Sequence, residues 1–160
     1  MEKLFVGKVV TTHGIKGEIK ILSDFQFKDK VFSVGNKLII DNNEYEIKSY
    51  RVHKGFDMVT LDDYHDINEV LFLLKKEVYV DKDSLDFSDD EVLDEELMEF
   101  EVITTDGRHG RILEIFYASP TNKVMRIDIG YEYLVPFNSP FMKKLDKKEK
   151  TVLVEILEVK

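Results

Sequence analysis

Cysteine is absent from the chain, which excludes disulfide bridges, thiolate catalysis and zinc sites built on cysteine. No run of about 18 apolar residues is present, so no transmembrane helix is expected. The first residues lack a long apolar stretch and a small-residue cleavage site, so no secretory signal is expected. These absences are compatible with the cytosol, and we predict a cytoplasmic protein that has no membrane partner.

Catalytic motifs are missing as well. The sequence has no glycine-rich phosphate loop, no His-Glu-x-x-His and no Gly-x-Ser-x-Gly. None of the four histidines, His13, His53, His65 and His109, lies three or four residues from another, so no local metal pair is visible. We therefore predict no catalytic residue, no metal and no cofactor, and a binding protein rather than an enzyme.

Negative charge is concentrated in one segment. The net charge is −9, and residues 81–101 alone hold 11 acidic side chains and 1 basic side chain. Such a segment is typical of a solvated linker. Overall acidity argues against indiscriminate nucleic-acid binding through a long-range basic field, but it leaves open a composite protein–RNA surface.

Short β-prone runs separated by turn residues occupy both sides of the acidic segment, and Phe56–Leu61 is one of the predicted strands. We predict a mainly β chain of two small β-barrel domains, residues 1–80 and 97–160, joined by an acidic linker, residues 81–96. One short helix is expected to close the N-terminal barrel. It begins after Asp66, and Glu69 follows three residues later as in a capping box.

A glycine-rich hairpin stands out near the start of the chain. The β-branched runs Val6–Val10 and Ile19–Ile21 flank Gly14 and Gly17, which accept backbone angles that other residues resist. The hairpin carries the cationic residues Lys8, His13, Lys16 and Lys20. His13 has two interpretations, a turn residue whose ring caps nearby carbonyls or a group that stacks on bases or donates to phosphate. Spacing alone favours the first.

Two further segments lie in the second half. Five lysines between positions 143 and 150 form the densest basic cluster, for which a solvated turn is favoured over a nucleic-acid patch because acidic residues intervene. The loop from Pro136 to Met142 holds two phenylalanines and a methionine. It is interpreted as packing at the end of a barrel, or as a protein-docking patch if it is exposed.

The order of several motifs resembles the RimM family of ribosome maturation factors. Gly7–Val9 followed by residues 13–20 is similar to the opening of that family, and residues 66–71 to the end of its N-terminal barrel domain. Residues 97–102 are similar to the start of a PRC-barrel domain, and Leu134–Phe137 to its Leu-Ile-Pro-Phe segment. The resemblance covers nearly the whole chain.

The resemblance implies a non-enzymatic assembly factor, expected as a monomer, that binds the precursor small ribosomal subunit transiently near its head. Its implied partners are a ribosomal protein of the head and the small-subunit rRNA, whose late folding and processing it assists. The residues implied in RNA or ribosome contact are Lys8, His13, Gly14, Lys16, Gly17 and Lys20. The residues implied in protein docking are Val92, Leu93, Pro136, Phe137, Phe141 and Met142.

One departure concerns docking. The family often carries two tyrosines and a tryptophan before its second domain, where this chain has Val92-Leu93-Asp94 and no tryptophan at all. Two other functions are kept as alternatives, a PRC-barrel adaptor that binds a protein partner without ribosome contact, and a small hydrolase. A pocket with converging polar groups would favour the hydrolase.

Overall fold

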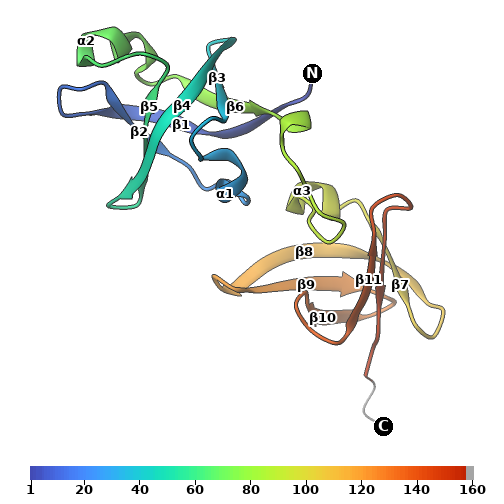
Figure 1. The fold of residues 1–160 in the computed structure, drawn as a ribbon. Coiled ribbons are helices and arrows are strands. Elements are labelled where there is room, and N and C mark those ends of the chain that lie inside the picture. The colour runs from blue at the N-terminus through green and yellow to red at the C-terminus, as the bar shows by residue number, and fades with distance from the viewer. Residues whose placement is uncertain (158–160) are drawn as a thin grey trace. The chain divides into compact units, whose positions relative to one another are not determined.

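The computed structural model describes residues 1–157, which divide after Asp86 into two compact units. Each unit is built on its own β-sheet (Figure 1). The strands of the first unit are β1 (Lys3–His13), β2 (Glu18–Leu22), β3 (Lys37–Ile40), β4 (Asn43–His53), β5 (Phe56–Leu61) and β6 (Glu77–Asp81). They form a closed barrel in the order β1-β2-β5-β4-β3-β6, in which all neighbours are antiparallel.

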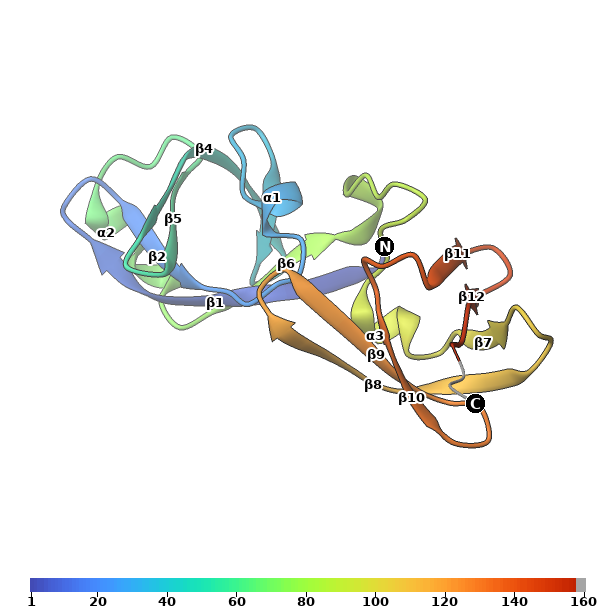
Figure 2. The same ribbon diagram turned by 90° about the horizontal axis from the view of Figure 1, so that it is seen from below.

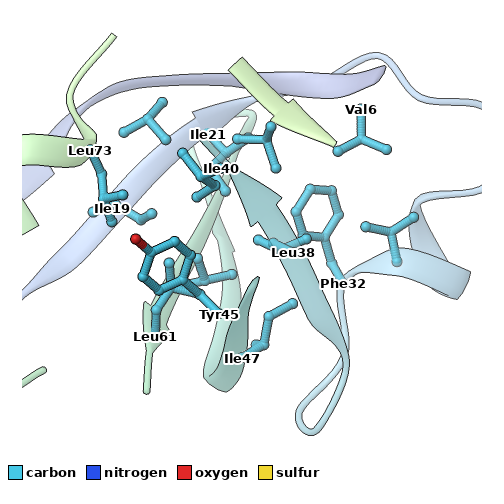
Figure 3. Packing of buried hydrophobic residues seen from close by; sticks show 14 of the residues in the cluster. Val6, Ile19, Ile21, Phe32, Leu38, Ile40, Tyr45, Ile47, Leu61 and Leu73 are labelled. Atoms are coloured by element: carbon cyan, nitrogen blue, oxygen red, sulfur yellow. The ribbon is translucent and has the colours of Figure 1, made fainter. Parts of the chain in front are cut away.

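In β2 and β6 buried apolar residues alternate with more exposed ones, so that one side chain in two faces inward. The inward side chains pack into one core, which Figure 3 shows from close by. Its fully buried members include Ile19, Ile21, Leu38, Ile40, Ile47, Leu61 and Leu73. Each strand thereby directs its remaining residues, among them the cations of the hairpin, to the outer surface.

Short helices accompany the barrel, namely α1 (Lys28–Val31), α2 (Ile67–Val70), η1 (Leu71–Leu73) and η2 (Lys82–Ser84). The predicted helix is present, and the Asp66 carboxylate accepts a hydrogen bond from the backbone N–H of Asn68, as an N-cap should. Glu69 accepts from the backbone N–H of His65 rather than from that of Asp66, so the capping box is displaced by one residue. Val70 and Leu73 enter the barrel core.

The second unit carries the strands β7 (Glu101–Thr104), β8 (His109–Ser119), β9 (Asn122–Asp128), β10 (Glu132–Pro136), β11 (Met142–Asp146) and β12 (Thr151–Val154), and it begins with helix α3 (Asp94–Leu97). Its six-stranded sheet has the order β10-β9-β8-β7-β12-β11. Strand β12 pairs in parallel with β7, whereas the other neighbours are antiparallel. A separate core includes Leu97, Val102, Met125, Ile127 and Val152.

The prediction of a mainly β chain with two sheets and a short helix is confirmed. The first sheet is a closed barrel, as predicted for both domains, whereas the second is a six-stranded sheet that ends at β10 and β11. The boundary after Asp86 falls within the predicted linker of residues 81–96. That linker is more ordered than its charge suggests, because Val92 is buried in the second core and Leu85 packs on the first. Helices α1 and α3 were not predicted. Across residues 1–157, no helix has the length and apolar character needed to cross a membrane.

Candidate nucleic-acid interface

The β1–β2 hairpin has the geometry that the sequence predicted. Val9, Ile19 and Ile21 are buried on its inner side. On the outer side Lys16 is exposed, and His13 and Lys20 are half-buried. The pairing of His13 with Glu18 leaves residues 14–17 as the turn.

The two glycines of this turn are required for different reasons. Gly14 has φ +67° and open space around it, so only its backbone angle favours glycine. Gly17 has φ +87° and is buried, and a Cβ there would lie 3.3 Å from the carbonyl oxygen of Asp66. The backbone N–H of Ile67 also donates to the carbonyl of Ile15 (2.9 Å). The start of α2 therefore holds the turn in place.

A second hairpin, between β4 and β5, lies beside the first. Its two-residue turn is Lys54-Gly55, with φ +51° and +82°, the left-handed angles that tight hairpins require. Strand β5 pairs with β2, Lys20 lying opposite Met58, and this pairing joins the two hairpins. Both views of the ribbon place the two turns on the side of the barrel away from the N-terminus (Figures 1 and 2).

Side chains of the two hairpins meet outside the barrel. The imidazole rings of His13 and His53 lie 5.5 Å apart between centroids, at 56° to each other. The ammonium of Lys20 lies 5.3 Å from the ring centroid of Phe56. We call the set the two-hairpin cluster, whose members are His13, Glu18, Lys20, Arg51, His53, Lys54 and Phe56.

The cluster is predominantly cationic. Its one carboxylate, Glu18, accepts two hydrogen bonds from the Arg51 guanidinium, at 2.9 and 2.8 Å. These bonds, and then the charges of Arg51 and the two histidines, lower the pKa of Glu18. Burial lowers the pKa of His53, and so do the charges of Arg51, Lys54, His13 and Lys20. The groups around His53 thus disfavour further positive charge.

The predicted ribosome-contacting residues are not all in one place. His13, Gly14, Lys16, Gly17 and Lys20 belong to the hairpin or its turn. Lys8 lies five residues before His13 on β1, about 17 Å away at about 3.4 Å per residue. Lys8 pairs with Leu22 on one side and Glu77 on the other, and it is not a member of the two-hairpin cluster.

Sequence reasoning missed Arg51, His53 and Lys54. The signal for the turn was present, because Lys54-Gly55 directly precedes a run that was predicted as a strand, Phe56–Leu61. The proximity to His13 had no signal, since it depends on pairing between β2 and β5, which are far apart in the sequence.

The predicted protein-docking residues of the second unit mostly lie in its core or pack against it. Val92 is 4% exposed. Phe137, Phe141 and Met142 are half-buried and pack against the core, while Leu93 and Pro136 are half-buried. This placement favours the barrel-end packing interpretation for the Pro136–Met142 loop. A docking role for these six residues stays a prediction.

A buried lysine contacts the Phe137 ring. Lys123 is 8% exposed, and its ammonium lies 4.3 Å from the ring centroid of Phe137 and 2.5 Å from a carboxylate oxygen of Asp94. The Tyr117 hydroxyl donates to the other oxygen of Asp94 (2.7 Å). Helix α3 is thereby tied to β8 and β9.

The lysine cluster of residues 143–150 is largely engaged within the second unit. Lys143 pairs with Glu155 (3.0 Å), and Lys144 lies 3.7 Å from Asp146. Lys147 donates to the carbonyl oxygens of Ser88 (2.6 Å) and Glu91 (2.9 Å). These contacts favour the interpretation as a turn over that as a phosphate-binding patch.

Two hollows of the first unit offer little catalytic chemistry. One, of about 340 Å³, is lined by residues that include Lys30, Asn36, Lys37, Glu44 and Ser84. The Ser84 hydroxyl donates to the carbonyl of Asp81 (2.6 Å). Among residues 1–157, no group of three or more histidine or acidic side chains is arranged to hold a metal ion.

Comparison with known proteins gives consistent matches over both units. The family model "RimM N-terminal domain" matches residues 4–85. The ribosome maturation factor RimM of Staphylococcus aureus strain MRSA252 is 35% identical over 164 residues, which cover 96% of this chain and 95% of that protein. RimM of strain JH9 has the same identity and the same coverage.

Solved structures are similar at lower identity. A crystal structure from Pseudomonas aeruginosa, of a protein named as a 16S ribosomal RNA processing protein RimM, is 20% identical with a TM-score of 0.49, covering 97% of this chain and 98% of that one. The solution structure of the N-terminal domain of RimM from Thermus thermophilus is 14% identical with a TM-score of 0.48, covering 54% of this chain and 98% of that one.

Proposed function

The chain belongs to the RimM family of ribosome maturation factors, and from this membership we propose that it binds the precursor small ribosomal subunit transiently, near its head, and assists late folding and processing of the rRNA. The observation that carries the proposal is the 35% identity to ribosome maturation factors over 96% of the chain. Because the match also spans 95% of the relative, it includes both units and not one shared module.

The two-hairpin cluster is the proposed contact with rRNA. It presents Lys20, Lys54 and two imidazoles on the outer surface of the barrel, together with the Phe56 ring. Lysines follow phosphates, whereas aromatic and imidazole rings stack on unpaired bases. The exposed Lys16 at the tip of the first hairpin extends this surface.

The second unit is the proposed contact with a ribosomal protein of the subunit head. Its half-buried residues Leu93, Pro136, Phe137, Phe141 and Met142 are partly accessible, and the last three pack against the core. The buried Val92 is proposed to support this surface and not to touch the partner. We further propose that the protein acts as a non-enzymatic monomer in the cytoplasm.

Sedimentation of ribosomes from a strain depleted of this protein tests the proposal. We expect fewer mature small subunits, more free precursor subunits and incompletely processed small-subunit rRNA. Normal subunit levels with fully processed rRNA would contradict it.

A pull-down with purified precursor small subunits separates this function from the adaptor alternative. The maturation factor is expected to co-sediment with precursor small subunits and to bind large subunits much less. An adaptor that binds only a protein partner would be recovered with neither.

A further inference from the structure

Two imidazoles share one small region of the barrel surface. His13 ends β1 and His53 ends β4, and both rings are half-buried with their centroids 5.5 Å apart. The charged groups that face them are Glu18 and Lys20 from β2, and Arg51 and Lys54 from β4 and its turn. Glu18 is already bound to Arg51 by two hydrogen bonds, so Lys20 and Lys54 leave the surroundings of the rings positive.

Protonation of both rings is unfavourable in this arrangement without an anion. Each imidazolium would repel the other and the ammonium groups of Lys20 and Lys54. Partial burial, and then the charges of Arg51, Lys54, His13 and Lys20, lower the pKa of His53. A bound anion reverses the balance, because an imidazolium donates from both nitrogens and forms stronger hydrogen bonds with a charged acceptor.

A phosphodiester meets this need. Its two non-bridging oxygens can each accept from one ring, and it stays singly charged across the range in which histidine titrates. Phosphates also recur along the RNA backbone, so that Lys54 and Lys16 can meet neighbouring groups.

Resting on the proposed function, we propose that His13 and His53 form a phosphate-binding site for the rRNA backbone that takes up protons when it is occupied, so that RNA binding at the two-hairpin cluster strengthens as pH falls from about 8 to about 6. Linkage fixes the sign. A ligand that binds the protonated rings more tightly raises their affinity for protons and is itself bound more tightly at lower pH.

The first test follows the imidazole ring protons of the full chain by NMR, titrated with pH in the absence and presence of a ten-nucleotide oligouridylate. His13→Gln, His53→Gln, His65→Gln and His109→Gln variants assign the four signals. We expect the midpoints of His13 and His53 to rise by about one pH unit when the RNA is present, and those of His65 and His109 to stay nearly constant. Four equal shifts, or none, would overturn the proposal.

The second test compares affinities. Wild-type protein is expected to bind the oligouridylate roughly 25-fold more tightly near pH 6 than near pH 8, because two midpoints that each rise by about one pH unit contribute about fivefold apiece over this range. In H13Q/H53Q the difference should fall below about twofold, whereas H65Q/H109Q, a matched control with the same number of histidines removed, keeps it. An undiminished pH dependence in H13Q/H53Q overturns the proposal, and so does a proton-linked affinity for deca-glutamate that equals that for RNA.

Binding to purified precursor small subunits distinguishes this proposal from the function on which it rests. If wild type and H13Q/H53Q bind subunits equally at both pH values, the phosphate site is wrong while the maturation function stands. If wild type ignores subunits at every pH but its RNA affinity stays proton-linked, the site stands and the function is wrong. Circular dichroism of each variant confirms that the surface substitutions leave the barrel folded.

Discussion

Substitution of two lysines in the first hairpin is the most direct test of RNA contact. Changing Lys16 and Lys20 to glutamate reverses two charges at the cluster and should weaken binding to precursor small subunits by about tenfold or more near 0.1 M salt, because fewer counterions are released. Co-sedimentation or surface plasmon resonance at two salt concentrations measures the loss of affinity. Lys144→Glu with Lys148→Glu is the control, since it makes the same change in net charge on the other unit. An equal loss in both double variants would remove the hairpin from the interface.

Alanine substitutions at two glycines test how closely neighbouring backbone atoms approach them. At Gly110 a Cβ would lie 2.1 Å from the backbone carbonyl oxygen of Asp128, so Gly110→Ala forces strand β8 from its place. We expect a loss of about 3 kcal/mol in the free energy of unfolding of the second unit. Gly14→Ala meets no atom within 4 Å and should cost only the left-handed angle, about 1–2 kcal/mol. Urea unfolding of both variants checks the order, and a costlier change at Gly14 would contradict it.

At the scale of elements, α1 is joined to the barrel through a buried carboxylate. Asp57 on β5 is 1% exposed, accepts a hydrogen bond from the Tyr50 hydroxyl (2.7 Å) and pairs with Lys28 of α1 (2.9 Å). Tyr50→Phe should destabilise the first unit by about 1.5–3 kcal/mol, because the bond is to a charged acceptor. Tyr79→Phe is the control, since its bond to Glu77 is exposed and should matter little.

Alkaline pH provides a second measurement of the same contact. Burial, and then the Asp57 carboxylate, raises the pKa of Tyr50 to about 12 from its ordinary 10.0. The stabilisation is present below the unfolded value and is lost as pH rises from 10.0 to about 12. The urea midpoint of the wild type should fall over this range more steeply than that of Tyr50→Phe. Parallel curves would show that Tyr50 is not the group responsible.

The β7–β8 turn gives a comparable test at acid pH. Hydrogen bonds from Arg108 and then Thr104 lower the pKa of Asp106 to about 2 from 3.8. Stability from this turn is therefore present above pH 3.8 and is lost as pH falls towards about 2. NMR of the Asp106 carboxyl carbon should show a midpoint well below 3.8, and Arg108→Gln should raise it. A midpoint that ignores this substitution would contradict the assignment to Arg108.

Local signals in the sequence predicted most elements, and non-local pairing explains what they missed. Phe56–Leu61 was predicted with the bounds that the structure shows, and the turn at Gly14 and Gly17 followed from their freedom at positive φ. Strand β11 was not predicted, and its lysines were interpreted as part of a basic cluster. A bulge between Met142 and Lys144 leaves Lys143 and Lys144 both exposed, which breaks the alternation expected of a strand. Helix α1 has four residues and no side-chain cap, so it carries no periodic signal.

The residues of the candidate site likewise fall into those that local sequence predicts and those that non-local pairing brings together. His13, Lys16 and Lys20 lie on one hairpin and could be found from a continuous stretch of sequence. Arg51, His53 and Lys54 join them only through the pairing of β2 with β5, for which no spacing rule exists.

At the scale of the whole molecule, the two units have cores that share no residue. We expect a fragment of residues 1–86 to fold alone, with the NMR spectrum of its barrel retained. Leu61→Ala should lower the stability of the first unit by about 2–5 kcal/mol and leave the second unchanged, while Met125→Ala should do the reverse. Coincident unfolding of both units in every variant would show a single cooperative body.

Closure of the barrel has a consequence for how fast it can form. Strand β6 completes the barrel by pairing with β1. This pairing places Asp81 opposite Lys3, although the two residues lie near opposite ends of the first unit's sequence. The β1–β2 and β4–β5 hairpins are local and can form within about 1–10 μs. Pairing of β6 with β1 brings together segments that are far apart in the sequence, at the cost of loop-closure entropy. We expect this non-local step to set the refolding rate of the first unit, on a scale of about milliseconds to seconds.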